Sequence, residues 1–309
     1  MLIRECSFEP ILIDSRCFRK GILLTLTTHN DKKTTAEISP LPGFNKETFE
    51  DALHQLQNLK RRLVTTWWTR QAVYYLENLG LYPSVFFGVE SALLDLLDPL
   101  PESELPSSYG FLLGSPQEIL DQTSILEKEG FYHVKVKLGH LIPEIAHQII
   151  QKIGNKFRLR IDLNRKWSFE ETSQFCAQYP PDFFEYIEEP VSKFQDLEHF
   201  SFPFALDETL RQNVNFSSIL QSKYLKAFII KPTLTYPIYP LLNLAASQVN
   251  KKLEIVLTSS FESIVGISQI RNLIQRLNLP KTYHGLDTLR YFESQNEPLP
   301  YRTLESTAT

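Results

Sequence analysis

The sequence predicts an α/β protein in which an N-terminal α+β unit precedes a barrel of alternating strands and helices. Up to about residue 98, strand-like runs come first and helical patterns follow, which is the order expected of an α+β unit. From about residue 109, apolar runs of strand length alternate with stretches of helix length, and this alternation is typical of parallel βαβ units. The middle strands also end in charged residues, as in enzyme barrels.

The N-terminal unit begins with two predicted strands at residues 8–13 and 21–27, separated by the polar, basic loop 15–20. Asn45 is placed to cap a first helix with Glu47 in its first turn. Further helical patterns cover residues 65–79 and 85–97. The prolines of Asp98-Pro99-Leu100-Pro101 break the last helix. The predicted domains are therefore residues 1–98, a barrel over 99–290 and a C-terminal tail over 291–309.

Seven strand-like runs make up the predicted barrel, at residues 109–113, 134–138, 159–163, 184–187, 204–206, 227–230 and 255–257. A short eighth run lies near residues 284–286, and helix-length stretches such as 116–128 and 144–153 separate most of the runs. This number of strands favours a closed barrel, although the pattern alone also fits an open, doubly wound sheet.

Two lysines, Lys135 and Lys137, stand two residues apart in the second of these runs. Residues two apart share one face of a strand, so both ammonium groups should converge on one site. Like charges this close disfavour each other's charged form, and the lowered pKa would suit a lysine general base. Taken alone, the pattern is more often that of an exposed strand with two solvated lysines.

Five consecutive strands end in charge, because Lys137, Asp162, Glu188, Asp207 and Lys231 follow one another at intervals of 19 to 26 residues. Such intervals match one βα unit of a barrel, so these groups should gather at one rim, where barrel enzymes keep their chemistry. A single aspartate at a strand end is usually a helix cap or a surface charge. Five charged residues at five successive strand ends, at the spacing of barrel units, favour an active site.

The three carboxylates, Asp162, Glu188 and Asp207, form a set of hard oxygen ligands suited to Mg²⁺, with Mn²⁺ as the alternative. In strand order Lys137 precedes them and Lys231 follows them, so the two lysines should face each other across the metal. A carboxylate substrate bound there would present its α-carbon between the lysines, and the cation would stabilise the enediolate formed by proton removal.

These residues and their neighbours resemble the enolase superfamily, and within it the enzymes that form o-succinylbenzoate in menaquinone biosynthesis. The barrel segments that carry the likeness are Lys135-Val136-Lys137, residues 160–164, 187–190, 206–208, 230–235, 259–263 and 285–288. Residues 37–44, Glu-Ile-Ser-Pro-Leu-Pro-Gly-Phe, add a likeness in the N-terminal unit. The resemblance implies a modified TIM barrel of the (β/α)7β type under an N-terminal α+β capping domain, to which the tail returns.

The resemblance also implies the role of each site residue. Asp162, Glu188 and Asp207 would bind Mg²⁺, and Lys137 would be the acid/base. Lys231 would place a cation against the opposite face of the ring intermediate, and Lys135 would keep Lys137 reactive. Supporting or substrate-binding roles would fall to Arg160, Asn164, Thr258, Ser259 and Gly285.

The implied reaction is the dehydration of 2-succinyl-6-hydroxy-2,4-cyclohexadiene-1-carboxylate to o-succinylbenzoate. Lys137 would remove the proton beside the ring carboxylate, Mg²⁺ would stabilise the enediolate, and the protonated Lys137 would assist syn loss of water.

Two other functions stay open. N-acylamino acid racemases and dipeptide epimerases of the same superfamily also need two opposed lysines. A non-catalytic binding barrel would be expected to lack a ligand or a lysine, and none is missing.

The overall composition agrees with an enzyme that acts on a small carboxylate. A net charge of -4 and a pI near 6.0 give no electrostatic footprint for nucleic acid. The chain contains no apolar run of about 18 residues, so no membrane insertion is expected. Three scattered cysteines, Cys6, Cys17 and Cys176, fit a reducing, cytoplasmic compartment better than a disulfide framework.

Overall fold

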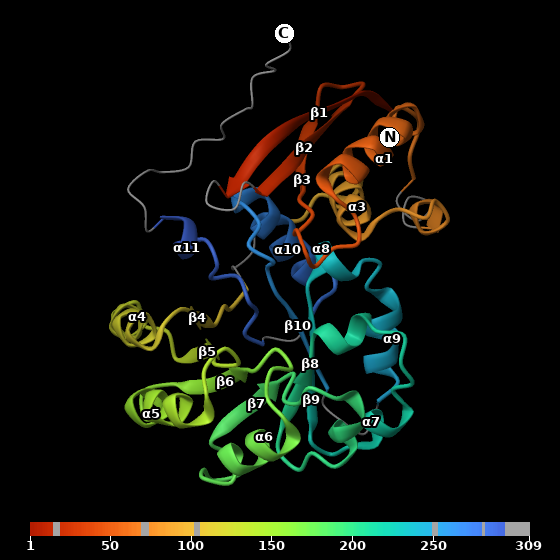
Figure 1. Ribbon diagram of the computed structural model, residues 1–309. Helices are drawn as coiled ribbons and strands as arrows, with labels where there is room; N and C mark the ends of the chain where they lie inside the picture. The colour runs from red at the N-terminus through yellow and green to blue at the C-terminus, as the bar shows by residue number, and fades with distance from the viewer. Residues whose placement is uncertain (15–18, 69–73, 102–105, 249–252, 280–281, 294–309) are drawn as a thin grey trace.

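Two sheets organise the protein in a computed structural model, in which residues 1–14, 19–68, 74–101, 106–248, 253–279 and 282–293 are described. One is a three-stranded antiparallel sheet near the N-terminus, and the other is a seven-stranded parallel sheet. Figure 1 shows the small sheet and its helices stacked on one end of the larger unit. The predicted order of an α+β unit followed by parallel βα units is confirmed.

The N-terminal unit, called the cap below, consists of β1 (Ile3–Asp14), β2 (Arg19–Thr28), β3 (Lys33–Ile38), α1 (Phe49–Leu63) and α3 (Pro83–Leu97). Its strands lie in the order β1-β2-β3. Ile22, Leu24 and Leu26 alternate along β2 and are fully buried, together with Leu56 and Leu63 of α1. The two predicted strands are confirmed, and both are longer than the apolar runs that indicated them.

Two helix predictions in the cap need correction. Asn45 does not cap α1: the helix begins at Phe49 with Thr48 as its N-cap, in a capping box with Asp51. The Asn45 side chain instead accepts from the Leu41 amide at 2.7 Å and donates to the Thr233 carbonyl at 2.9 Å. Of the predicted helix 65–79, residues 74–77 are helical, 65–68 are not, and 69–73 lie outside the described residues.

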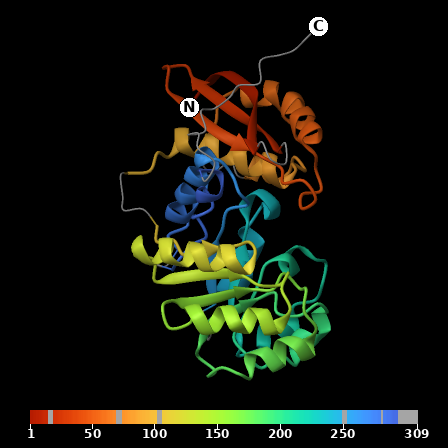
Figure 2. The same ribbon diagram turned by 60° about the vertical axis from the view of Figure 1, so that its left-hand side comes forward.

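The parallel sheet follows the predicted runs closely. Its strands are β4 (Gly110–Leu112), β5 (His133–Lys137), β6 (Arg158–Asp162), β7 (Phe184–Glu188), β8 (Phe204–Leu206), β9 (Leu225–Ile230) and β10 (Glu254–Leu257), paired in chain order. The helical elements are α4 (Pro116–Lys128), α5 (Pro143–Ile153), α6 (Phe169–Cys176), η1 (Phe194–Glu198), η2 (Glu208–Arg211), α7 (Ser217–Gln221), α8 (Pro232–Thr235), α9 (Tyr239–Ala246), α10 (Ile264–Arg276) and α11 (Arg290–Glu293). Figure 2 shows α4, α5 and α6 along the outside of the strands.

The two edges of this sheet are joined through the predicted eighth run. His284 forms a parallel bridge with Ser108, just before β4, and Gly285 forms one with Thr258, just after β10. The Tyr109 amide donates to the His284 carbonyl at 3.0 Å, and the Gly285 amide donates to the Leu257 carbonyl at 2.9 Å. The strands therefore close around an interior, which decides for a barrel and against an open, doubly wound sheet.

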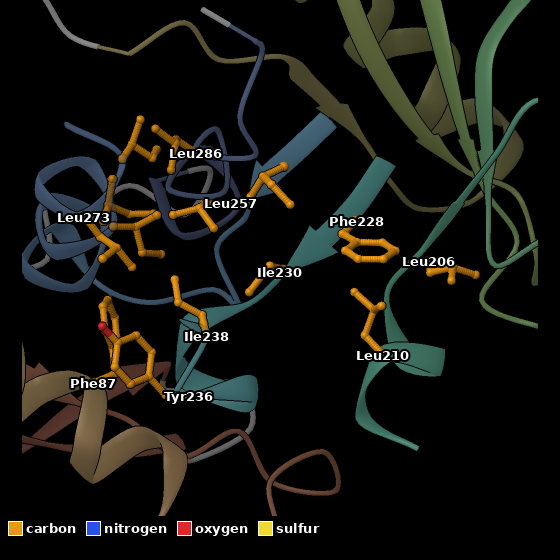
Figure 3. Close-up of a cluster of buried hydrophobic side chains, with 14 of the residues drawn as sticks. Phe87, Leu206, Leu210, Phe228, Ile230, Tyr236, Ile238, Leu257, Leu273 and Leu286 are labelled. Atoms are coloured by element: carbon orange, nitrogen blue, oxygen red, sulfur yellow. The ribbon is translucent and has the colours of Figure 1, made fainter. Parts of the chain in front are cut away.

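The cap and the barrel share one hydrophobic core. Phe87 of α3 packs against Tyr236, with ring centroids 5.3 Å apart, and Figure 3 shows this pair continuing through Ile238 toward Ile230 and Leu257 of the barrel. Phe292 of α11 packs on the cap cluster of Ile11, Ile13 and Leu23. In the described part of the chain, no helix has the length and apolar character needed to span a membrane.

Candidate active site

The charged residues that end the middle strands do lie side by side. In the parallel ladder Lys137 stands opposite Asp162, and Asp162 stands opposite Glu188. Asp207 directly follows β8, and Lys231 directly follows β9. The strands alternate their side chains, and Val134, Val136 and Leu138 point into the surrounding hydrophobic core while the lysines point into the barrel. The predicted gathering at one rim is thus what the strand register produces.

Lys135 holds the first two carboxylates together. Its ammonium lies 2.6 Å from Glu188 Oε1 and donates a hydrogen bond to it. It also lies 2.9 Å from Asp162 Oδ2, a charge contact outside hydrogen-bond geometry. All three side chains are at most 5% exposed. Because an unpaired buried charge is costly, this ion pair fixes the positions of both carboxylates.

Asp207 is paired from the other side. The Lys231 ammonium donates a hydrogen bond to Asp207 Oδ2, and Arg211 lies 3.9 Å from Asp207 Oδ1. Two lysines therefore pair with the three carboxylates, Lys135 with Asp162 and Glu188, and Lys231 with Asp207. The predicted placement of Lys137 and Lys231 on opposite sides of the carboxylates follows from their strands.

The protonation of these groups differs from the sequence-based expectation. Burial alone would lower the pKa of Lys135, but the carboxylates of Asp162 and Glu188 outweigh burial and hold that pKa well above its usual value. Burial would also lower the pKa of Lys231, but the Asp207 carboxylate outweighs burial and raises that pKa above its usual value. The expected fall in pKa from lysine crowding is wrong for Lys135, because its ammonium is paired with two carboxylates.

The donor set fits a divalent cation, although no closed cluster is formed. Within the described ranges, no three His, Cys, Asp or Glu side chains are grouped closely enough to hold a metal ion. However, Asp162 Oδ2 and Glu188 Oε2 are buried oxygens without a hydrogen-bond partner. Buried carboxylate oxygens normally have partners, and hard oxygens of this kind suit Mg²⁺. Asp162, Glu188 and Asp207 could therefore hold such an ion.

A cavity of about 40 Å³ opens beside these charges. Six of the predicted site residues line it: Lys135, Lys137, Lys231, Thr258, Ser259 and Gly285. Two larger cavities, of about 450 and 500 Å³, lie on the cap beside Trp67 and Trp68 and contain none of the predicted residues. We assign the site to the small cavity because the paired charges meet there.

The end of β10 and the bridging run 284–286 contribute another part of the cavity wall. Thr258 Oγ1 lies 3.4 Å from Tyr109 Oη, and Ser259 Oγ donates to Glu262 Oε2 at 2.6 Å. A Cβ atom at Gly285 would overlap both Thr258 Oγ1 and Tyr109 Oη. A residue larger than glycine would therefore fill the cavity at this point.

Arg160 and Asn164 do not line the cavity. Arg160 lies deeper in the barrel, where its guanidinium is sandwiched 5.1 and 5.0 Å from the rings of Tyr109 and Tyr186. It donates to Glu185 Oε2 at 2.6 Å and to the Tyr283 carbonyl at 2.6 Å. The main-chain N–H of Asn164 donates to Asp162 Oδ1 at 3.0 Å and so orients that carboxylate, while the Asn164 side chain donates to Glu208 Oε1 at 2.9 Å. The supporting or substrate-binding roles expected of Arg160 and Asn164 therefore stay predictions.

Five lining residues were not selected from the sequence: Tyr109, Phe111, Phe261, Asp287 and Thr288. Phe111 and Phe261 face each other with ring centroids 6.1 Å apart. Asp287 receives a hydrogen bond from Arg290 Nε at 2.7 Å, and Thr288 shares one of 2.8 Å with Ser259. Phe261, Asp287 and Thr288 lie within segments that carried the family likeness, which was the available signal. Nothing in the pattern singled out Tyr109 or Phe111.

Fold and site together define an enolase-like barrel enzyme with a separate cap. A family described as "Enolase C-terminal domain-like" matches residues 118–296, and one described as "MenC, N-terminal domain" matches residues 11–96.

The curated relatives make the class narrower. An o-succinylbenzoate synthase from Vibrio cholerae serotype O1 (strain M66-2) is 31% identical over 93% of this chain and 87% of that protein. One from Salmonella dublin is 30% identical over 92% and 88%. The chain therefore belongs to the o-succinylbenzoate synthase family of the enolase superfamily, whose members are hydro-lyases of menaquinone biosynthesis.

Solved structures support the fold. MenC from Desulfotalea psychrophila LSv54 superposes with a TM-score of 0.72 at 19% identity, covering 92% of this chain and 93% of that one. The L-Ala-D/L-Glu epimerase from Bacillus subtilis gives a TM-score of 0.77 at 18% identity, covering 94% and 91%. At these identities the likeness concerns the fold alone.

Proposed function

We propose that this chain dehydrates 2-succinyl-6-hydroxy-2,4-cyclohexadiene-1-carboxylate to o-succinylbenzoate, with Mg²⁺ as cofactor and Lys137 as the acid/base. The observation that carries the assignment of the base is a difference among the three cavity lysines. Lys135 and Lys231 are ion-paired with carboxylates. For Lys137, by contrast, the described residues place no carboxylate within ion-pair distance, and its side chain is half-buried at the cavity. A general base must be free to meet its proton.

The other charged residues would prepare the site. Asp162, Glu188 and Asp207 would hold the metal, which supplies electrostatic stabilisation for negative charge that develops on the substrate carboxylate. Asn164 would keep Asp162 oriented through the hydrogen bond of 3.0 Å that its main-chain N–H donates. Lys135 would support Lys137 by holding Asp162 and Glu188 in place beside it. We assign Arg160 to the barrel interior, without a substrate contact.

In the proposed reaction, Lys137 both accepts the proton and later donates it. Neutral Lys137 takes the proton from the ring carbon that bears the carboxylate. The resulting ammonium gives a proton to the departing hydroxyl on the neighbouring carbon, so that water leaves and the ring becomes aromatic. One group on one face serves both events, which corresponds to a syn elimination. Lys231 would face the opposite side of the ring as a cation.

Binding requires the cavity to widen, because about 40 Å³ holds a water molecule rather than a substituted ring. The lysines are the most adaptable lining groups, since each has a long, flexible stem. Movement of Lys231 away from Asp207 would both free a metal ligand and enlarge the cavity.

A cytoplasmic location, expected from the scattered cysteines, remains part of this proposal.

An ultraviolet assay with the cyclohexadiene substrate tests the function. Purified protein with Mg²⁺ should remove the diene absorbance, and EDTA should stop the reaction. The same preparation should be given N-succinylamino acids in D₂O, where racemisation would introduce deuterium at the α-carbon. Two opposed lysines would also suit that reaction. Deuterium incorporation without diene loss would replace the proposed dehydration by racemisation.

A further inference from the structure

The wall of the proposed site includes a loop with an unusual backbone. Residues 259–263, which we call the pocket loop, connect the end of β10 to α10, and Ser259 and Phe261 of this loop line the cavity. Phe261 has a φ of 62°, in the left-handed region that residues with a Cβ rarely adopt. Such a conformation persists only where surrounding contacts hold it.

Arg19 of the cap supplies those contacts. It is 1% exposed, and its guanidinium donates hydrogen bonds to four main-chain carbonyls. Nη1 donates to the carbonyls of Ser260 and Phe261, both at 2.6 Å. Nη2 and Nε donate to the carbonyls of Ser39 and Pro40 at 2.6 and 3.3 Å. One guanidinium therefore joins the end of β3 to two consecutive carbonyls of the pocket loop.

The far end of the pocket loop is also held from the cap. Glu37 of β3 is 2% exposed and accepts from the amides of Ser263 and Gly266 at 3.2 and 3.3 Å, at the start of α10. Inside the loop, Glu262 Oε2 accepts from the Ser260 amide at 2.5 Å. The backbone of the loop is thus satisfied partly by the cap, and the side chain of Phe261 is left to face the cavity and Phe111.

We propose that Arg19 is a positioning residue for substrate binding: it holds Phe261 in its left-handed conformation and thereby places the aromatic wall of the cavity. The inference deepens the proposed function and rests on it. Arginine suits this task because its planar fork carries five donors in a fixed geometry, whereas a lysine ammonium could not span carbonyls on two sides. Lys137 is on a different strand, so loss of Arg19 should weaken binding more than the chemical step.

Three variants test the proposal: Arg19→Met, Arg19→Lys and, as a matched control, Arg276→Met. Arg276 also joins the barrel to the cap, through Asp95 at 2.9 Å and the Asp98 carbonyl at 2.6 Å, but it does not line the cavity. Arg19→Met should raise KM about tenfold or more, because small displacements in a site are costly, with kcat changed less than about threefold. Arg19→Lys should fall between it and the wild type.

A second readout does not depend on turnover. Amide hydrogen exchange of the peptide that contains residues 259–263 should be faster in Arg19→Met than in the wild type, and unchanged in Arg276→Met. Equal KM values for the two methionine variants at similar melting temperatures, or unchanged exchange in the pocket loop, would overturn the proposal. If the wild type fails to consume the diene, the proposed function fails, and the exchange comparison still decides whether Arg19 holds the loop.

A double-mutant cycle locates the effect at Phe261. Glycine adopts a left-handed conformation freely, so Phe261→Gly removes the need for Arg19 to hold that backbone. The exchange increase caused by Arg19→Met should therefore be smaller in the Phe261→Gly background than in the wild type. Independent, additive effects would show that Arg19 does not act through Phe261.

Discussion

Glu90 joins the cap to the barrel as a buried carboxyl, and its replacement by glutamine should change how stability depends on pH. It lies in α3 and is 1% exposed. Tyr239 Oη donates to Glu90 Oε1 at 2.9 Å, and Tyr236 Oη donates to Glu90 Oε2. Burial raises the pKa of Glu90 to about 7, an effect that Tyr239 and Arg276 oppose and Glu77 reinforces.

The stability of the protein depends on pH because the folded and unfolded states bind different numbers of protons at Glu90. Above the usual glutamate pKa of 4.5 the unfolded chain loses this proton, while folded Glu90 keeps its proton until its own pKa of about 7. The folded state then binds more protons, so stability falls as pH rises through this window. At about 1.36 kcal/mol per pH unit, the wild type loses roughly 2 to 3 kcal/mol between about pH 5 and pH 8 through this one group.

Glu90→Gln removes the titration while keeping the shape. The variant should match the wild type near pH 5 and exceed it by roughly 2 to 3 kcal/mol near pH 8. With an unfolding entropy of about 2.1 cal/mol/K per residue over 309 residues, that gain is a rise in Tm of about 4 °C. Differential scanning fluorimetry at both pH values measures it, with the exposed Glu5→Gln as a control that should show no such trend. A Tm difference between Glu90→Gln and wild type that stays constant with pH would refute the reasoning.

Three further outcomes follow from the site. Lys137→Ala should lower diene turnover by about 10² to 10⁴ or more without a change in Tm or circular dichroism, and turnover near the wild-type rate would end the proposed mechanism. Mg²⁺ at about 100 times its Kd should stabilise the wild type by about 2.7 kcal/mol in thermal melts. Asp162→Asn should lose most of this stabilisation, and equal stabilisation of both proteins would place the ion elsewhere. Gly285→Ala should raise KM, because its Cβ would overlap Thr258 Oγ1 and Tyr109 Oη; an unchanged KM would show that substrate does not use this wall.

The sequence was sufficient for those parts of the molecule that repeat. Each barrel strand is a short apolar run whose side chains alternate between the core face and the barrel interior. Lys137, Asp162 and Glu188 occupy matching positions at the ends of their strands. Parallel pairing then sets them side by side, as the ladder shows. Even the short run at 284–286 could be found, because a closed barrel requires a segment between its two edges.

Features that depend on contacts between distant residues could not be predicted in this way. The N-cap of α1 was misassigned to Asn45 because several residues near it can cap a helix, and tertiary contacts with Leu41 and Thr233 decided where Asn45 points. The pKa shift of Lys135 was expected to be downward from its neighbour Lys137. Its actual neighbours are Asp162 and Glu188, 27 and 53 positions away along the chain.

The reacting groups and the aromatic wall of the cavity are held in place by different parts of the molecule. The charged groups that would perform the reaction come from successive barrel strands, so they stay in place as long as the barrel closes. The aromatic wall depends instead on Arg19, which reaches the Ser260 carbonyl across 241 positions of the chain. Substitutions in the cap can therefore reshape the cavity without moving a lysine or a carboxylate. In such a protein, changes of substrate should be sought first in the contacts between the cap and the pocket loop.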